Sequence, residues 1–493
     1  MAALRKLLWA LGVFALAGVY LAVVTVSYQS RQSLDAGSVQ DDEDALLQAG
    51  ARSLLLDEHD VLQHEKDALL QHEKDALLQH EKDALLQHEK DALAQLANLN
   101  REQRVRDAMK HLTKELPKDN NGTLVIDFNC ATRRHVRPED DLPPPPSASS
   151  ALFEWVWEAN EALHVLNEDL FGTLAERPPQ RVIVVQVHRR GRYARWLLQS
   201  LSAVPGIESA LLVLSHGHVD DALLGLAREV CFCRVARVFF PWSVQLWGDQ
   251  FPGLDCVKGS TVKDGKPCKR EPLVTVAKHH WWWLHNFVFN EVLVAAKYKG
   301  VTLFLEEDMY LSPDALHVLD RMQEAAPAAD MYILNDNKGF ISKSSHRLVQ
   351  QGHWVYNLGL ALHERAWPKI VRCAAMFCSY NDYNWDWTLQ AVGAKCVPGR
   401  FATAVMRGSR LFHIGKCGGM HFHGVSDCDA LVLEARALLR REGDLLFPDA
   451  LVVQKTDSVP VMGQPNGGWV DRRDHKLCLD NANASLHRWG KAR

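Results

Sequence analysis

The stretch that decides the fold is VTLFLEED, residues 301–308, in which apolar and β-branched residues run directly into three acids. The apolar part predicts a buried strand. Three carboxylates at the end of a buried strand repel one another, and a divalent metal ion relieves that repulsion. Because open α/β sheets bind ligands beyond the carboxyl ends of their strands, the stretch favours an enzyme that handles a diphosphate. The alternative is a solvated loop whose acids cap the next helix.

Strand-like runs and helical stretches alternate ahead of that strand. The strand-like runs are residues 182–187, 211–214 and 235–240, and helical stretches such as 193–201 and 287–297 lie between them. This alternation predicts an α/β fold with a mostly parallel sheet. No glycine-rich dinucleotide fingerprint or Walker loop follows any of these runs in the sequence.

The amino-terminal residues predict a membrane anchor. Residues 7–26 carry no charge and follow Arg5 and Lys6. About 20 apolar residues span a bilayer as one helix, and the basic flank keeps the amino end in the cytosol. We therefore expect a cytosolic tail at residues 1–6, a retained signal anchor and a lumenal body, with a cleaved signal peptide as the alternative. Eleven cysteines agree with an oxidising compartment.

Residues 27–150 predict a stalk that precedes a globular domain at residues 151–493. The clearest part of the stalk, residues 64–95, repeats the octad HEKDALLQ four times, with Ala94 replacing a leucine in the last copy. The composition favours a helix, but eight residues advance a helix by two turns and about 80°, so the leucines form no heptad seam. The repeat is either a spacer or a helix that binds a partner, and PPPP at 143–146 ends the stalk as a stiff linker.

The composition also bounds the class of protein. The formal net charge of the 493 residues is −4, which provides no basic field for a nucleic acid. We therefore exclude nucleic acid as a partner. The chain after the stalk is long enough for one large α/β domain or two small ones.

Four further motifs carry candidate chemistry. QVHRRG at 186–191 places polar and cationic groups at a strand end, where a nucleotide would meet them. In KHHWWW at 278–283, the tryptophans wedge a helix between layers, or the lysine and histidines contact a diphosphate or a sugar. YNWDWT at 383–388 sets one acid between two indoles, which suits a general base with a raised pKa or an ordinary acid at a helix start. FHIGKCGGMH at 412–421 holds a histidine that is either structural or a metal ligand.

These motifs, together with NGGW at 466–469, closely resemble those of the N-acetylglucosaminyltransferase II family, in the same order over residues 180–480. The resemblance implies a GT-A-type, Rossmann-like α/β fold and an inverting, metal-dependent glycosyltransferase. It implies transfer of N-acetylglucosamine from UDP-GlcNAc, in β-1,2 linkage, to the α-1,6-arm mannose of N-glycans on glycoproteins, at the Golgi membrane. The alternatives are a related transferase that acts on another terminal mannose and a non-catalytic, membrane-tethered glycan-binding protein. A homodimer is a further expectation.

The resemblance also implies roles for individual residues. Asp308 and His413 would coordinate Mn²⁺, with support from Glu306 and Glu307, and Asp386 would be the catalytic base. The contacts to the UDP-sugar would be Gln186, Val187, His188, Arg190, Lys278, His279 and His280. Arg189 and Gly217 stand where the family has aspartates near the nucleotide, which implies a change in uracil recognition.

The matching cysteines imply disulfide bonds in the domain that follows the stalk. The implied pairs are Cys256 with Cys268, Cys373 with Cys396, Cys378 with Cys478, and Cys417 with Cys428. Three cysteines, Cys130, Cys231 and Cys233, are left without an implied partner. Because the total is odd, at least one thiol is free or shared between chains.

Overall fold

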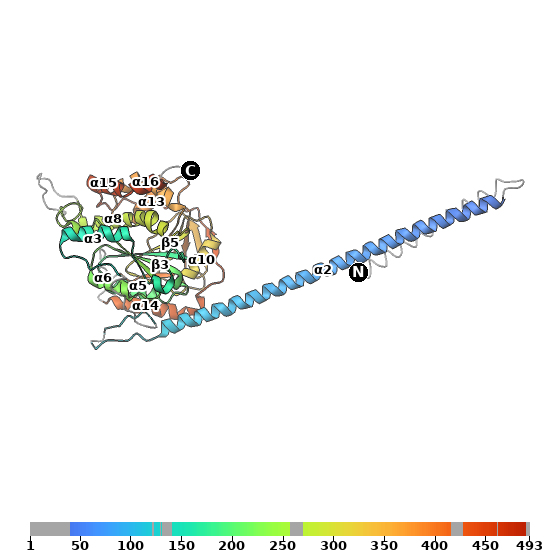
Figure 1. Ribbon diagram of the computed structural model, residues 1–493, viewed down its shortest axis with the longest axis horizontal. Helices are drawn as coiled ribbons and strands as arrows, with labels where there is room; N and C mark the ends of the chain where they lie inside the picture. The colour runs from blue at the N-terminus through green and yellow to red at the C-terminus, as the bar shows by residue number, and fades with distance from the viewer. Residues whose placement is uncertain are drawn as a thin grey trace. The chain divides into compact units, whose positions relative to one another are not determined.

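The structure is a computed structural model that describes residues 40–120, 123–128, 130, 141–256, 270–415, 427–460 and 462–489. The chain divides into two compact units, one ending at Ala94 and one beginning at Gln95. A long helix, α2 (Gln40–Thr113), supplies the described residues of the first unit and the start of the second (Figure 1).

The octads form helix, as their composition predicts. Four glutamine side chains, spaced eight residues apart, each donate a hydrogen bond to the aspartate four residues later. The first pair is Gln63 and Asp67, the last is Gln87 and Asp91, and the distances are 2.9–3.4 Å. Side-chain pairs at this spacing each stabilise an isolated helix by about 0.2–0.5 kcal/mol. The leucines of the octads are between 47% and 71% exposed. The repeat therefore sustains its helix through local bonds and not through a heptad seam.

The membrane prediction requires correction. The predicted anchor at 7–26 lies outside the described residues, and none of the helices that the structure describes is both long and apolar enough to cross a bilayer. The longest helix, α2, carries a glutamate, a lysine and an aspartate in every octad, and such charges are costly inside a bilayer. The transmembrane part of the predicted fold class and the predicted single-pass Golgi location are therefore not supported. The predicted homodimer stays a prediction, because one chain is described.

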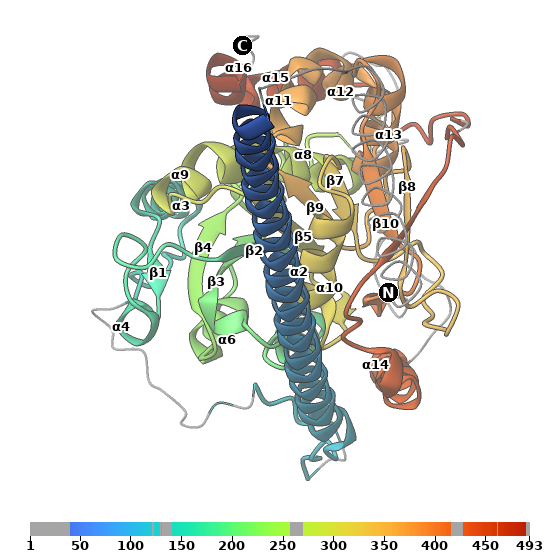
Figure 2. The ribbon, with the colours of Figure 1, turned by 90° about the vertical axis from the view of Figure 1, so that its right-hand side faces the viewer.

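The second unit is built on a mixed sheet that has ten strands in the described residues, in the order β1-β4-β3-β2-β5-β9-β7-β10-β8-β12. The parallel half consists of β4 (Arg234–Phe239), β3 (Ala210–His216), β2 (Arg181–Val187) and β5 (Val301–Glu306), which Figure 2 shows side by side. The remaining strands are β1 (Val165–Leu166), β9 (Leu360–His363), β7 (Met331–Ile333), β10 (Thr403–Met406), β8 (Leu348–Gly352) and β12 (Val452–Lys455).

The α/β prediction is confirmed, but the sheet is less parallel than the sequence predicts. β9 runs antiparallel to both β5 and β7, and β8 runs antiparallel to β10. These strands are short and were not among the predicted runs, which all lie in the parallel half. A second, two-stranded sheet pairs β6 (Met309–Leu311) with β11 (Leu411–His413) and sets His413 opposite Met309.

Helices cover both faces of the large sheet. Along β2, Ile183 and Val185 belong to one apolar core and Val182 and Val184 to the other, as expected for a strand buried on both faces. Figure 1 shows α8, α13, α15 and α16 on one face and α5, α6 and α14 on the other. The α-helices are α3 (Ser149–Ala162), α4 (Glu168–Phe171), α5 (Gly191–Leu201), α6 (Asp221–Glu229), α7 (Val244–Trp247), α8 (Pro272–Phe287), α9 (Leu293–Ala295), α10 (Ala315–Ala325), α11 (Ala366–Arg372), α12 (Ala374–Ser379), α13 (Trp385–Lys395), α14 (Cys428–Arg441), α15 (Arg472–Asn481) and α16 (Asn483–Trp489). The short helical turns are η2 (Ile207–Ser209), η3 (Val288–Val292) and η5 (Gly443–Leu445).

Part of the predicted stalk packs inside the second unit. Ala108 and Leu112 of α2 are buried in one apolar cluster with Val432 and Leu439 of α14. Arg436, also on α14, donates to the carbonyl of Leu112 at 3.0 Å. The compact unit that holds the sheet therefore begins well before residue 151, while the other predicted domain boundaries stay predictions.

Two of the four implied disulfides are seen. Cys373 bonds to Cys396 and Cys378 bonds to Cys478, which ties α12 to α15. Cys256 is also disulfide-bonded, but Cys268 and Cys417 lie outside the described residues. Two cysteines that the resemblance leaves without a partner, Cys130 and Cys231, form a third described bond, and among the described cysteines Cys233 is a buried free thiol.

Candidate active site

A cavity of about 650 Å³ opens at the carboxyl ends of the parallel strands. This is the position at which α/β sheets bind ligands and at which the acidic stretch was expected. Its lining includes Gln186, His188, Arg189, Arg190, Gly217, His218, Phe240, His280, Glu306, Asp308, Asn357, Tyr383, Asn384, Trp385, Asp386 and His413.

The three acids at the end of β5 have three different environments. Glu307 points into the protein and is fully buried, where it accepts hydrogen bonds from the backbone N–H of His188 and from Nε of Arg190, both at 2.7 Å. It therefore ties the end of β2 to the end of β5. Glu306 faces the cavity and accepts from Nε1 of Trp385 at 3.3 Å. Burial, and the nearby charge of Asp308, raise the pKa of Glu306 to about 7.

Asp308 lies between two cationic groups. Its Oδ2 is 2.8 Å from Nη1 of Arg190 and 3.4 Å from Nε2 of His413. Burial acts to raise the pKa of Asp308, but the hydrogen bond with His413 and the charge of Arg190 outweigh it and lower the pKa to about 2. The same hydrogen bond raises the pKa of His413 against the effect of burial. Asp308 is therefore a carboxylate at neutral pH.

The pairing of β6 with β11 brings His413 to Asp308. The backbone N–H of Ile414 donates to the carbonyl of Asp308 at 2.9 Å, which closes the turn beside the strand pair. A Cβ atom on the next residue, Gly415, would lie 2.1 Å from Oδ2 of Asp308 and 2.9 Å from Nε2 of His413. Only glycine fits at this position while both groups keep their places.

The residues fit a divalent metal ion with two protein ligands. Oδ1 of Asp308 is buried without a hydrogen-bond partner, and such an acceptor is costly unless something binds it. Mn²⁺ accepts both carboxylate oxygen and imidazole nitrogen as ligands. No cluster of three or more histidine, cysteine, aspartate or glutamate side chains suited to a metal occurs in the described residues.

Asp386 faces the same cavity from the first turn of α13. Its Oδ1 accepts from the backbone N–H of Trp387 at 2.9 Å, and burial raises its pKa to about 6. Trp385 on one side stacks on Trp281 of α8 with ring centres 4.7 Å apart, while Trp387 on the other side is 42% exposed. An acid with such a pKa is mostly ionised at neutral pH and is still basic enough to accept a proton.

The KHHW residues of α8 have separate positions. His280 lines the cavity, stacks on Phe240 and shares a 2.8 Å hydrogen bond with Ser215. Burial, and then the neighbouring His188, lower the pKa of His280 well below its ordinary value, so the ring is neutral. His279 is buried instead against α15, with Nε2 2.8 Å from Oδ1 of Asp474.

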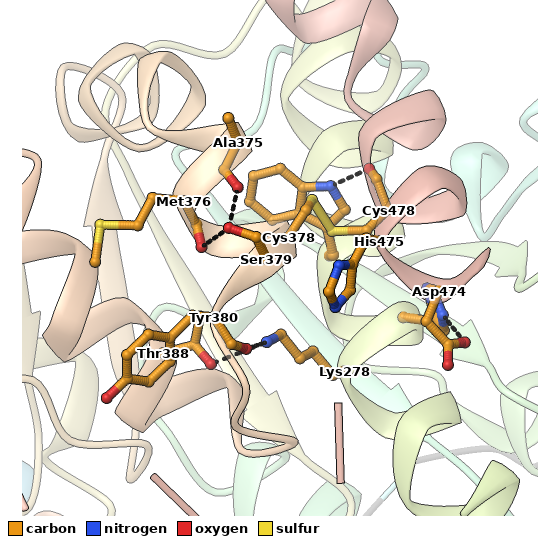
Figure 3. The surroundings of a disulfide bond; sticks show 12 residues. Lys278, Ala375, Met376, Cys378, Ser379, Tyr380, Thr388, Asp474, His475 and Cys478 are labelled. Carbon is orange, nitrogen blue, oxygen red and sulfur yellow. Dashed lines mark hydrogen bonds and ion pairs between the residues drawn. A yellow bond between two sulfur atoms is a disulfide. The ribbon is translucent and has the colours of Figure 1, made fainter. Parts of the chain in front are cut away.

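Lys278 is fully buried and does not line the cavity. Figure 3 shows its ammonium group pointing toward Tyr380 and Thr388, beside the Cys378–Cys478 disulfide. Of the predicted donor contacts, the structure therefore brings Gln186, His188, Arg190 and His280 to the cavity. It does not bring Val187, Lys278 or His279 there; Val187 packs in the core beneath the site.

The cavity also explains one departure from the family pattern. A Cβ atom on Gly217 would lie 2.9 Å from Nδ1 of His188 and 3.0 Å from Nδ1 of His280. The two imidazoles thus fill the space that a side chain at position 217 would need. Arg189, the other departure, contacts Nδ1 of His218 at 3.2 Å at the edge of the cavity.

Several lining residues escaped the sequence analysis in this role, and three of them are instructive. Phe240 follows β4 and stacks on His280, Asn357 precedes β9, and Trp385 stacks on α8. Only Trp385 belongs to a motif. Phe240 could have been found as the last residue of a predicted strand, whereas Asn357 lies in a loop with no sequence signal of its own.

Together the fold and the site define an α/β enzyme domain with a ligand cavity over the strand ends, a carboxylate and imidazole pair suited to a metal, and a separate basic carboxylate. Comparison with known proteins identifies which kind. The family model described as N-acetylglucosaminyltransferase II matches residues 154–478. The chain belongs to this family and is a glycosyltransferase.

Individual relatives agree with the family. The chain is 36% identical over 366 residues to the human alpha-1,6-mannosyl-glycoprotein 2-beta-N-acetylglucosaminyltransferase, an alignment that covers 68% of this chain and 81% of the relative. The protein of the same name from Rattus norvegicus is 36% identical, with 66% and 78% covered. The one from Arabidopsis thaliana is 31% identical, with 64% and 77% covered. The family resemblance seen in the motifs is thus confirmed.

Proposed function

We propose that this protein transfers N-acetylglucosamine from UDP-GlcNAc to the 2-hydroxyl of the α-1,6-arm mannose of an N-glycan, in β-1,2 linkage. The observation that carries the proposal is that Asp386, Asp308 and His413 line one cavity in a chain of this family. The named activity of the relatives at 31–36% identity supports the transferred sugar and the acceptor arm.

Asp386 acts as the general base in this proposal. Its carboxylate takes the proton of the acceptor 2-hydroxyl while that oxygen attacks the anomeric carbon of N-acetylglucosamine. The bond from the anomeric carbon to the diphosphate oxygen breaks on the opposite face, and UDP leaves with the bonding electrons. One displacement inverts the α linkage of the donor to a β linkage, so no second nucleophilic carboxylate is needed.

Asp308 and His413 would hold Mn²⁺. When bound, the metal supplies a Lewis acid that neutralises charge developing on the leaving diphosphate. Arg190 supplies a fixed cation at the same place, because its guanidinium spans Glu307 and Asp308 at 2.7 and 2.8 Å. Glu307 in turn accepts the hydrogen bond of the backbone N–H of His188, just after β2. This bond keeps the distance constant between the acids at the end of β5 and the donor-side residues at the end of β2.

On the donor side of the cavity, burial lowers the pKa of the two imidazoles, His188 and His280, which favours their neutral form. Nε2 of Gln186 lies 3.2 Å from Nε2 of His188, and His280 is fixed by Ser215. These groups bind and orient a nucleotide through hydrogen bonds, and Phe240 supports the ring of His280 from behind. Lys278 and His279 would influence the donor only through other residues, because both are buried away from the cavity.

The proposal is tested by incubating the protein with UDP-GlcNAc, Mn²⁺ and two N-glycan acceptors that differ in which mannose arm is free. We expect product only from the acceptor with the α-1,6 arm free, and its loss in Asp386→Asn. Transfer to another mannose alone would overturn the branch assignment. Absence of transfer by protein that binds UDP would overturn the activity and favour a glycan-binding role.

A further inference from the structure

The segment that carries Asp386 is held in place by a buried lysine. Nζ of Lys278 donates to the carbonyl oxygens of Asp382 at 2.7 Å and Tyr380 at 3.2 Å, and to Oγ1 of Thr388 at 3.0 Å. These acceptors lie before and after Asp386 in the chain. The lysine thus ties α8 to both sides of the first turn of α13 (Figure 3).

The hydrogen-bond acceptors of this ammonium group are neutral oxygens. Its charge also lies over the ring of Trp469, 4.4 Å from the ring centre, and over that of Phe377 at 5.1 Å. Burial lowers the pKa of Lys278 well below its ordinary value. An ammonium group is costly to bury, so the hydrogen bonds that it donates must offset this cost. A role in positioning the segment that carries Asp386 accounts for a lysine at this place.

The NGGW motif at 466–469 also holds this segment by hydrogen bonds. The carboxylate of Asp382 accepts from the backbone N–H and from Nδ2 of Asn466, both at 3.0 Å. Gly467 accepts from the backbone N–H of Tyr383 at 3.0 Å, and the positive φ of +77° at Gly468 lets the chain pass the Tyr383 ring, which a Cβ there would meet at 3.3 Å. Lys278, Thr388 and the NGGW motif together form what we call the clamp, which holds the residues around Asp386.

The clamp acts on Asp386 through Thr388. The hydroxyl that accepts from Lys278 also lies 2.8 Å from the carbonyl of Asn384, two residues before Asp386. Trp281, three residues beyond Lys278 on α8, stacks on Trp385. Lys278 and Trp281 lie on one face of α8. Together they fix the start of α13 and the indole of Trp385, which is next to Asp386.

We propose that Lys278 is a positioning residue that holds the carboxylate of Asp386 at the cavity, and not a contact of the sugar nucleotide. This inference rests on the proposed role of Asp386 as the base. Losing the ammonium group removes a hydrogen-bond donor from each of three oxygens around α13 and frees the first turn of this helix to shift. On the donor side, Gln186 lies near the end of β2, and His280, although it is also on α8, keeps its own hydrogen bond with Ser215.

The test uses the full chain and three substitutions on the clamp. Lys278→Met removes the ammonium at similar volume, Thr388→Val removes the hydroxyl at constant shape, and Thr388→Ser restores it. Lys369→Met is the matched control, because it breaks a 2.6 Å lysine ion pair with buried Asp330, which none of the clamp residues contacts. Measurements are UDP affinity by calorimetry, which also counts folded sites, and kcat and donor KM per folded site.

We expect kcat per folded site to fall about 100-fold in Lys278→Met and about tenfold in Thr388→Val, since small misplacements of a reacting group cost this much. UDP affinity and donor KM should stay at wild-type values in both. Thr388→Ser should restore kcat, and Lys369→Met should leave it unchanged per folded site.

Two outcomes would overturn the inference. If Thr388→Val and Lys278→Met keep wild-type kcat while Asp386→Asn abolishes transfer, Asp386 is the base and Lys278 does not position it. If Lys278→Met weakens UDP binding instead of kcat, the lysine serves the donor. Should Lys278→Met fail to fold, the Thr388→Val and Thr388→Ser pair decides the matter. Failure of the proposed function is recognised separately, by a wild-type protein that transfers no sugar.

Discussion

The end of β5 and the middle of α8 differ in how directly a run of polar residues in the sequence marks the functional site. At the end of β5, Glu306 and Asp308 both face the cavity while Glu307 turns inward. On α8, successive residues turn by about 100°, so neighbours in sequence point in different directions. Lys278 and His279 face other helices and His280 faces the cavity. A run of polar residues marks a site at a strand end, but on a buried helix it marks several unrelated contacts.

The largest effect should come from Asp386, which belongs to neither region. Asp386→Asn keeps the shape of the side chain but removes its ability to accept a proton, so kcat should fall about 1,000-fold. UDP affinity should not change, because Asp386 acts on the acceptor. Initial-rate kinetics with calorimetry of UDP measure both. A variant with kcat within a few-fold of wild type would show that another group is the base.

Asp308 tests the strand-end side of the comparison. Asp308→Asn removes the charge that faces Arg190 and His413, and transfer should fall about 100-fold as the diphosphate loses its metal-side stabilisation. Mn²⁺ binding in the presence of UDP, followed by electron paramagnetic resonance of the free ion, should weaken in parallel. Unaltered Mn²⁺ affinity would place the metal elsewhere or remove it from the reaction.

His280 and His279 test the helix side with one matched pair. His280→Ala should raise the donor KM about tenfold, because it removes a cavity hydrogen bond. His279→Ala should leave KM unchanged but destabilise the fold by about 2 kcal/mol, since it opens a cavity and takes one partner from Asp474. Kinetics and thermal unfolding of both proteins check this. A raised KM in His279→Ala would mean that adjacency on α8 does matter for the donor.

The pH dependence gives a further check on Asp386. Its pKa is raised to about 6 by burial, and the base works only when ionised. Transfer should therefore be full above pH 7 and fall about tenfold per pH unit below 6, as protons occupy the carboxylate. The profile of kcat/KM from pH 4.5 to 8.5 measures this, with UDP binding as the control. An acid limb centred near pH 4 would contradict the buried environment of Asp386.

The smallest effect is expected from the octads. Deleting residues 64–87 removes three whole repeats from the first compact unit and leaves Gln63 four residues before Asp91, the aspartate of the last repeat. Since these residues belong to another unit than the cavity, kcat and KM should not change. A loss of activity would assign the repeat a part in catalysis that its local hydrogen bonds do not suggest.

The sequence predicted the features that depend on local pattern. The parallel strands, the position of the acids after β5 and the helical octads all follow from periodicity and composition. The environment of Asp386, between two indoles, also agrees with the raised pKa that its neighbours suggested. These features involve residues that are close together in the chain.

Features that depend on distant partners could not be predicted in the same way. The antiparallel strands β8 and β9 are short and lack a clear alternation, and the bond between Cys130 and Cys231 joins residues 101 positions apart. Lys278 and His279 looked like substrate contacts because their partners, Thr388 and Asp474, lie far along the chain. The contacts of such residues become clear only when the packing of α8 against α13 and α15 is known.

The most direct test of the account is the stereochemistry and linkage of the product. The wild-type protein is incubated with UDP-GlcNAc, Mn²⁺ and an N-glycan whose α-1,6-arm mannose is free, and the purified product is analysed by proton NMR. The account predicts a β-linked N-acetylglucosamine on the 2-hydroxyl of that mannose, because one displacement assisted by Asp386 inverts the donor. An α linkage would contradict the single-displacement mechanism.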